Sequence, residues 1–113
     1  MPNIEIDDRL TVVIEFEVEP SHQSELIESL ADSVEQHFGI YPGFISASFH
    51  ASNDGRRIIN YAQWQSEKSW NEFRSSTTEN DEGQAEREAA MIRCGAKAVS
   101  IGAFRVARVV ENV

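Results

Sequence analysis

Two hydrophobic patterns follow each other along the first part of the chain and predict its first elements. From Leu10 to Val18 every second residue is apolar, which is the pattern of a strand with one buried face. After Pro20 the apolar residues recur at helical spacing up to a stop at Gly39, as Leu26, Ile27, Leu30, Val34 and Phe38. A strand followed by an amphipathic helix is therefore predicted.

Two further strand-like segments, Phe44 to Ser52 and Arg56 to Gln65, flank the turn sequence Asn53-Asp54-Gly55 and predict a β-hairpin. With Asp54 and Gly55 at the centre of the turn, three pairs should face each other across the strands. These pairs are Phe49 with Asn60, Ala47 with Ala62, and Ile45 with Trp64. Because side chains alternate along a strand, the six residues share one face, which we expect to lie against the helices. His50, Ile59 and Tyr61 then lie on the opposite face.

The rest of the chain predicts two helical segments and a last strand. Ser66 is placed to cap a short helix that runs to Ser75 and directs Trp70 and Phe73 into the core. The polar residues from Ser75 to Gly83 predict a surface loop before a second helical run, whose apolar residues are Ala85, Ala89, Ile92 and Ala96. The segment from Val99 to Val110 predicts a strand that is apolar on both faces.

The order strand, helix, strand, strand, helical region, strand is that of an α+β, ferredoxin-like βαββαβ fold. We expect one domain over residues 1–113, with residues 1–9 as a flexible N-terminal segment. Helices on one face of the sheet leave the other face bare, and that face carries Val13, Ile59 and Tyr61 among polar residues. A homodimer that forms through the sheet would cover it.

Composition narrows the possible partners. Ten basic and nineteen acidic residues give a net charge of −9, which disfavours nucleic acid and anionic membrane surfaces. No apolar run is long enough to span a membrane, and the first ten residues lack a signal-peptide pattern, so we expect a cytoplasmic protein. Cys94 is the single cysteine and is interpreted as a small helix residue. No group of His, Cys, Asp and Glu has metal-ligand spacing along the chain, so no metal is predicted.

A stretch of about thirty residues carries a family resemblance. It comprises the turn Pro42-Gly43-Phe44, the hairpin with Asp54-Gly55, the run Asn60-Tyr61-Ala62-Gln63-Trp64, and the following helix with its aromatic residue. Together these pieces resemble the antibiotic biosynthesis monooxygenase superfamily of dimeric α+β barrels. Within it, the sequence is most similar to the cofactor-independent monooxygenases that oxidise anthrone-type polyketide intermediates to quinones with molecular oxygen.

The resemblance implies a set of site residues. Asn60 and Trp64 match an Asn and a Trp that stand four apart on a strand in these enzymes, and they are the expected catalytic residues. Trp70 stands where quinone-forming members carry a substrate-binding tyrosine, and Arg87 matches a substrate-orienting arginine. Phe49 and Phe73 would complete an aromatic slot for a flat substrate. No cofactor is implied; the partners are a small aromatic substrate and O₂.

The residues themselves give independent support to Asn60. It is the one amide on an otherwise apolar strand face, where an unpaired polar group costs about 1–3 kcal/mol. An amide N–H at this place can stabilise negative charge on a ring oxygen while the substrate loses a proton. The alternative is a structural amide that bonds to the nearby backbone.

Other members of the superfamily suggest other activities. Haem-degrading members use a helix histidine as iron ligand, and another group carries a histidine shortly after the strand tryptophan, but this chain has no histidine beyond Trp64. Surface or structural roles are expected for His22, His37 and His50. The main alternative is a non-catalytic dimeric barrel that binds a small hydrophobic ligand or serves as an accessory or regulatory subunit.

Overall fold

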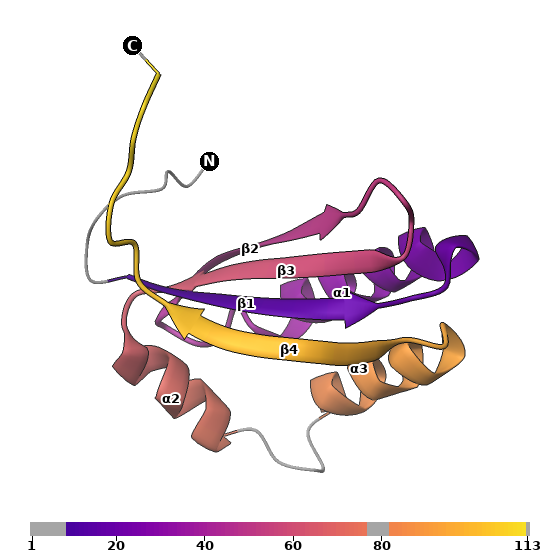
Figure 1. Ribbon diagram of the computed structural model, residues 1–113. Helices are drawn as coiled ribbons and strands as arrows, with labels where there is room; N and C mark the ends of the chain where they lie inside the picture. The colour runs from indigo at the N-terminus through magenta and orange to yellow at the C-terminus, as the bar shows by residue number, and fades with distance from the viewer. Residues whose placement is uncertain (1–8, 77–81, 113) are drawn as a thin grey trace.

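The computed structural model describes residues 9–76 and 82–112 (Figure 1). Residues 1–8 of the predicted flexible segment lie outside this range. Along the chain the elements are β1 (Leu10–Glu17), the short 3-10 helix η1 (Pro20–His22), α1 (Gln23–His37), β2 (Phe44–Ala51), β3 (Arg57–Trp64), α2 (Glu67–Ser76), α3 (Glu82–Arg93) and β4 (Lys97–Phe104). In this part of the chain no helix combines the length and the apolar character needed to cross a bilayer.

The strands form one antiparallel sheet in the order β2-β3-β1-β4, and the three α-helices lie on one side of it (Figure 1). This confirms the predicted α+β, ferredoxin-like fold; its second helical region consists of two helices, α2 and α3. The helix-facing side of β1 carries Val12, Ile14 and Phe16. Their neighbours across the ladder on β3 are Ala62, Asn60 and Ile58.

The hairpin register agrees with the prediction except at one end. Phe49 pairs with Asn60 and Ala47 with Ala62, as predicted, and Gly55 has a φ of 78°, a conformation that glycine adopts most easily. The predicted pairing of Ile45 with Trp64 is wrong. A β-bulge between Phe44 and Ser46 leaves Ile45 out of the ladder and places Phe44 opposite Trp64.

Helix α1 covers the sheet with the stripe that its periodicity predicts. Leu26 and Leu30 are buried together with Phe16 and Ile58 in one core cluster. Full burial of such side chains stabilises the fold by about 1.5–3 kcal/mol each. These contacts hold α1 against the face of the sheet that β1 and β3 form.

The helices after β3 differ from the sequence prediction in detail. Ser66 caps α2 as predicted, because its Oγ accepts a hydrogen bond of 3.1 Å from the Ser69 N–H. The predicted loop from Ser75 to Gly83 is shorter, since α2 continues to Ser76 and α3 begins at Glu82; residues 77–81 lie outside the described residues.

In α3 the apolar residues from which the helix was predicted are exposed, with Ile92 at 82%, and the buried residues are Gly83 and Ala90.

The last strand is shorter than predicted and begins earlier. It spans Lys97–Phe104 instead of Val99 to Val110, and the chain then leaves the sheet (Figure 1). Its last pair joins Phe104 to Thr11, the second residue of β1, and the described residues that follow Phe104 do not continue the ladder. Phe104 is 57% exposed within one chain.

Candidate active site

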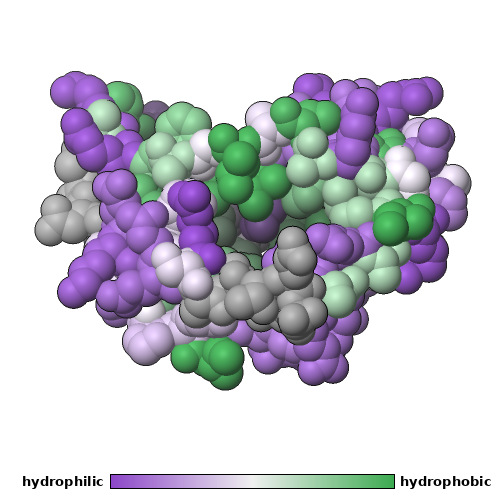
Figure 2. Space-filling view, turned by 90° about the horizontal axis from the view of Figure 1, so that it is seen from below, coloured by the Kyte–Doolittle hydropathy of each residue, from purple (hydrophilic) through white to green (hydrophobic). Residues whose placement is uncertain are grey.

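A cavity of about 920 Å³ lies between the sheet and the helices. Figure 2 shows the helical side of the molecule with a hollow near its centre, bordered by hydrophobic residues. The volume suits a small multi-ring molecule, since ligand sites typically measure about 300–1,000 Å³. The wall includes all six predicted site residues: Phe49, Asn60, Trp64, Trp70, Phe73 and Arg87.

Trp64 forms a fixed part of the cavity wall. Its side chain is almost fully buried, at 1% exposure, and its ring centroid lies 5.0 Å from that of Phe73 and 5.3 Å from that of Phe44. Phe38, at the end of α1, lies 4.7 Å from Phe73 and closes the cluster. Because rings on three sides restrain the indole, its orientation is determined before any ligand binds.

Asn60 brings a polar group to the same wall. It is 9% exposed, and its Oδ1 is buried without a hydrogen-bond partner. Two other side-chain oxygens in the described part of the chain share this condition, those of Thr11 and Gln63, but they belong to the opposite face of the sheet. Among these three residues, Asn60 alone lines the cavity.

Arg87 reaches the cavity from α3 and is held from two sides. Its Nη1 donates a hydrogen bond of 3.1 Å to the Ser33 Oγ, and its Cζ lies 5.2 Å from the centre of the Phe38 ring. The buried Ser33 hydroxyl in turn donates to the Gly83 carbonyl at 3.3 Å. One serine of α1 thus anchors both the guanidinium and the first turn of α3.

Trp70 and Phe73 line the cavity from α2, three residues apart on one helix face. The Arg74 Cζ lies 4.5 Å from the centre of the Trp70 ring, in cation–π geometry, and Arg74 also lines the cavity. This part of the wall presents an aromatic surface beside a positive charge.

Sequence reasoning missed the contribution of α3 beyond Arg87. Gln84, Glu88 and Met91 also line the cavity, and Gln84 Nε2 donates to Glu88 Oε1 at 3.2 Å. With Arg87 these residues stand at i, i+3, i+4 and i+7, so helical spacing from Arg87 was the signal that could have found them. Among the described residues of the wall, Glu88 is the only acidic one.

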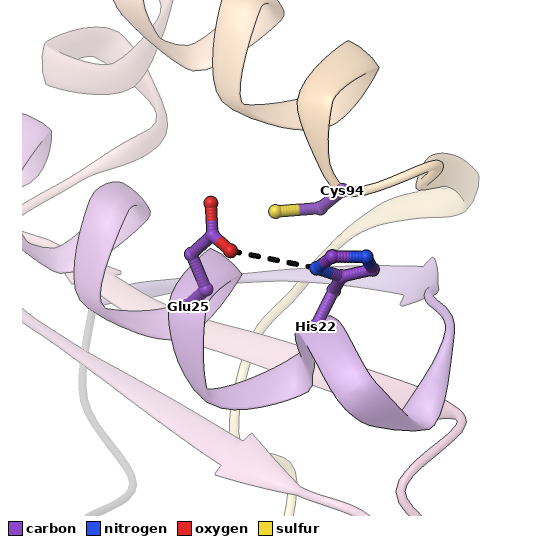
Figure 3. Close-up of side chains that lie close together, drawn as sticks. All are labelled: His22, Glu25 and Cys94. Carbon is purple, nitrogen blue, oxygen red and sulfur yellow. Dashed lines mark hydrogen bonds and ion pairs between the residues drawn. The ribbon is translucent and has the colours of Figure 1, made fainter.

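No histidine lies in the described wall of the cavity. His50 is on the outer face of the sheet, as predicted, with its Nε2 3.0 Å from the Ser48 Oγ, and His37 Nε2 lies 3.1 Å from a Glu86 carboxylate oxygen. His22, however, lies close to Glu25 and Cys94 (Figure 3), a grouping of possible metal ligands that spacing along the chain could not show.

Fold and cavity together define a ferredoxin-like domain with an aromatic-lined cavity between the sheet and the helices, and the sequence assigns it to a family. The profile of the antibiotic biosynthesis monooxygenase family matches residues 9–81, and the chain belongs to this family.

Individual relatives agree with this assignment. Tetracenomycin-F1 monooxygenase of Streptomyces glaucescens is 47% identical over 60 residues, which cover 53% of this chain and 54% of that relative. The match therefore spans about half the length of that relative.

Solved structures share the fold over nearly the whole chain. A monooxygenase from the gene ActVA-Orf6 of Streptomyces coelicolor, in complex with nanaomycin D, is 32% identical, with 90% of this chain and 92% of that one covered and a TM-score of 0.65. SnoaB, a cofactor-independent oxygenase from Streptomyces nogalater, has a TM-score of 0.66 at 16% identity, with 94% and 100% of the two chains covered.

Proposed function

We propose that this protein oxidises a flat, hydroxylated aromatic polyketide intermediate of the anthrone type to a quinone with O₂, without a bound cofactor. The observation that carries the proposal is the Asn60 side chain, whose buried, unpaired Oδ1 lies in the wall of a cavity otherwise rich in aromatic and aliphatic side chains. Similarity to a tetracenomycin-F1 monooxygenase and to a monooxygenase that binds nanaomycin D supports an aromatic polyketide as substrate.

The reaction requires the protein to stabilise an anion. When the anthrone CH₂ group loses a proton, negative charge moves to the ring oxygen, and the electron-rich carbanion reacts with O₂. The hydroperoxide formed at that carbon then loses water and leaves a carbonyl group, so one oxygen atom enters the quinone and the other leaves as water. A hydrogen bond that the Asn60 Nδ2–H group donates to the ring oxygen, and the positive charge of Arg87, stabilise the anion.

Glu88 is our assignment for the group that takes the proton. A carboxylate in the wall can reach a bound substrate directly or through one water. Its Oε1 already accepts a hydrogen bond from Gln84, which leaves its other oxygen available for the substrate side. Trp64 and Trp70 stack against the rings and orient the reacting carbon.

The test uses two buried amides that differ in the face they occupy. Purified protein with a model anthrone in air should give quinone absorbance and O₂ uptake, and Asn60→Ala should lower turnover at least about tenfold, or about 1.4 kcal/mol of transition-state stabilisation. Trp64→Phe should also slow the reaction. Gln63→Ala removes an equally buried unpaired amide from the outer face and should keep the wild-type rate.

Two outcomes would count against the proposal: turnover no faster than the uncatalysed reaction, or equal rates in the Asn60 and Gln63 variants. Ligand binding without turnover, seen as quenching of tryptophan fluorescence, would favour the alternative of a non-catalytic ligand-binding barrel.

We infer that the protein forms a homodimer through the outer face of the sheet. Ile59 and Phe104 are 36% and 57% exposed on that face, next to the half-buried Val13 and Tyr61. Light scattering after gel filtration should give the mass of a dimer, and Ile59→Lys should shift it to the monomer. The same change at Ile92, an exposed residue of α3, is the control and should leave the dimer intact.

A further inference from the structure

Three potential metal ligands converge at the ends of η1 and α3, outside the cavity wall. His22 ends η1, Glu25 lies in the first turn of α1, and Cys94 follows α3 directly. Figure 3 shows the thiol directed toward the carboxylate and the imidazole. His22 Nδ1 lies 3.4 Å from Glu25 Oε1, and the three ligand atoms all lie within 4.8 Å of one another.

We propose that His22, Glu25 and Cys94 bind a divalent transition-metal ion of the zinc type, through Nδ1, a carboxylate oxygen and Sγ, with water as the fourth ligand. Zinc binds these three kinds of donor at about 2.0–2.3 Å, which places the ligand atoms of a tetrahedral site roughly 3.5 Å apart. The His22 and Glu25 atoms already have that spacing. The group as a whole needs to contract by about 1 Å; because Cys94 is fully buried, rotation of the exposed His22 and Glu25 side chains toward its Sγ supplies this movement.

Arg93 is compatible with this site because it holds a different oxygen of the same carboxylate. Its Nε donates to Glu25 Oε2 at 2.7 Å and its Nη2 to the Ser29 Oγ at 3.1 Å, while Oε1 faces His22. Hydrogen bonds of this outer kind orient metal ligands in proteins. A thiolate and a carboxylate also balance the charge of a dication, so the guanidinium meets no net positive charge.

The protonation states of Glu25 and Cys94 affect how a metal ion binds. Hydrogen bonds from Arg93 and His22 lower the pKa of Glu25, which keeps this ligand ionised at neutral pH. Burial raises the pKa of the Cys94 thiol, so the metal has to displace its proton on binding. The ion can meet His22 and Glu25 from solvent, because their side chains are 41% and 44% exposed, whereas Cys94 is fully buried and its thiol is reached once these two side chains move.

The consequence of metal binding is structural. The ligands join the start of α1 to the end of α3, whereas the cavity is lined by other residues of these helices. A bound ion should therefore raise the melting temperature and leave the oxidation chemistry of the cavity unchanged. It also restrains α3, the helix that carries Arg87 and Glu88.

The test uses Co²⁺ as a spectroscopic probe on tag-free protein freed of metal by a chelator. Binding should produce the near-ultraviolet charge-transfer band of a cobalt–thiolate bond, Zn²⁺ should displace the cobalt, and Zn²⁺ should raise the melting temperature of the wild type. Cys94→Ser should lose the band, and His22→Ala should weaken Co²⁺ binding by about tenfold or more. His50→Ala, a control at a histidine on the outer face of the sheet, should bind like the wild type.

Three results would overturn the site: no charge-transfer band in the wild type, a band that survives in Cys94→Ser, or equal affinity of wild type and His22→Ala. Circular dichroism of the metal-free variants separates loss of ligand from loss of fold. Because the readout is a metal–sulfur bond, failure of the proposed oxygenase activity would not affect the result.

Discussion

Phe44 lies directly opposite Trp64 on the β2–β3 ladder, and the centroids of their rings are 5.3 Å apart in an edge-to-face arrangement. The β-bulge at Ile45 creates this pair, because it shifts the register by one residue at the end of the hairpin. The indole that lines the cavity is therefore supported by a phenylalanine that does not itself line the cavity.

Phe44→Ala should destabilise the protein more than Ile45→Ala. Loss of a partly buried ring that packs on Trp64 should lower the free energy of unfolding by about 2 kcal/mol or more, whereas Ile45 lies outside the ladder. Urea denaturation of both variants measures the difference. Equal losses would mean that the bulge does not select Phe44 as the partner of Trp64.

Ser33→Ala should weaken substrate binding through Arg87. The change removes the acceptor of the Arg87 Nη1 bond and the donor to the Gly83 carbonyl, so we expect a severalfold higher KM and a loss of about 1–3 kcal/mol in stability. Ser29, one turn earlier in α1, offers a matched control because it accepts a bond from Arg93 away from the cavity. If Ser29→Ala raised KM equally, a specific role of Ser33 would be excluded.

Glu88→Gln should slow proton removal separately from the reaction with oxygen. In D₂O without O₂, the wild type should speed exchange of the anthrone CH₂ protons for deuterium, measured by NMR, and the variant should exchange about 100-fold more slowly. Glu72→Gln, on the exposed side of α2, should match the wild type. Unchanged exchange in Glu88→Gln would assign the proton to solvent instead.

Asp54→Asn should destabilise the hairpin at neutral pH but not in acid. The Asp54 carboxylate accepts hydrogen bonds from the Ser52 hydroxyl at 2.7 Å and from the Arg56 N–H at 3.0 Å, and these bonds hold its pKa below the ordinary value of 3.8. Because the folded-state pKa is the lower one, the stabilisation is present above pH 3.8 and is lost as pH falls through the folded value.

The measurement for Asp54 is the urea midpoint of both proteins at neutral pH and near pH 3. The urea midpoint of the wild type should exceed that of Asp54→Asn at neutral pH, and the difference between the two midpoints should be smaller in acid. Asp32→Asn, at an exposed position of α1, is the control for loss of one negative charge. A difference in urea midpoint that does not change with pH would rule out the link between the Asp54 pKa and stability.

Short-range patterns along the chain determined most of the fold. Period-two and helical spacing located β1 and α1, the Asp54-Gly55 turn fixed the pairing of Phe49 with Asn60, and Ser66 marked the start of α2. These features depend on neighbours in sequence, which is why local propensity and side-chain alternation can predict them. The six candidate site residues, predicted partly from the family resemblance, line one cavity; for Phe49 and Asn60 the reason is the correctly predicted strand register.

Contacts between segments that are distant in the sequence determined the buried face of α3 and the end of β4. In α3, hydropathy pointed to Ala85, Ala89 and Ile92, but close packing on α1 selected the face with Gly83, where an added Cβ would come within 2.8 Å of the His37 ring. Strand β4 ends at Phe104, whose partner is the second residue of β1, although the apolar pattern continues to Val110.

The meeting of His22 and Glu25 with Cys94, about seventy residues apart in the sequence, likewise exists only once α1 and α3 pack together. Periodicity in a sequence specifies which residues share a face. The packing of the whole chain determines which of these faces meet and where the pairing of a strand ends.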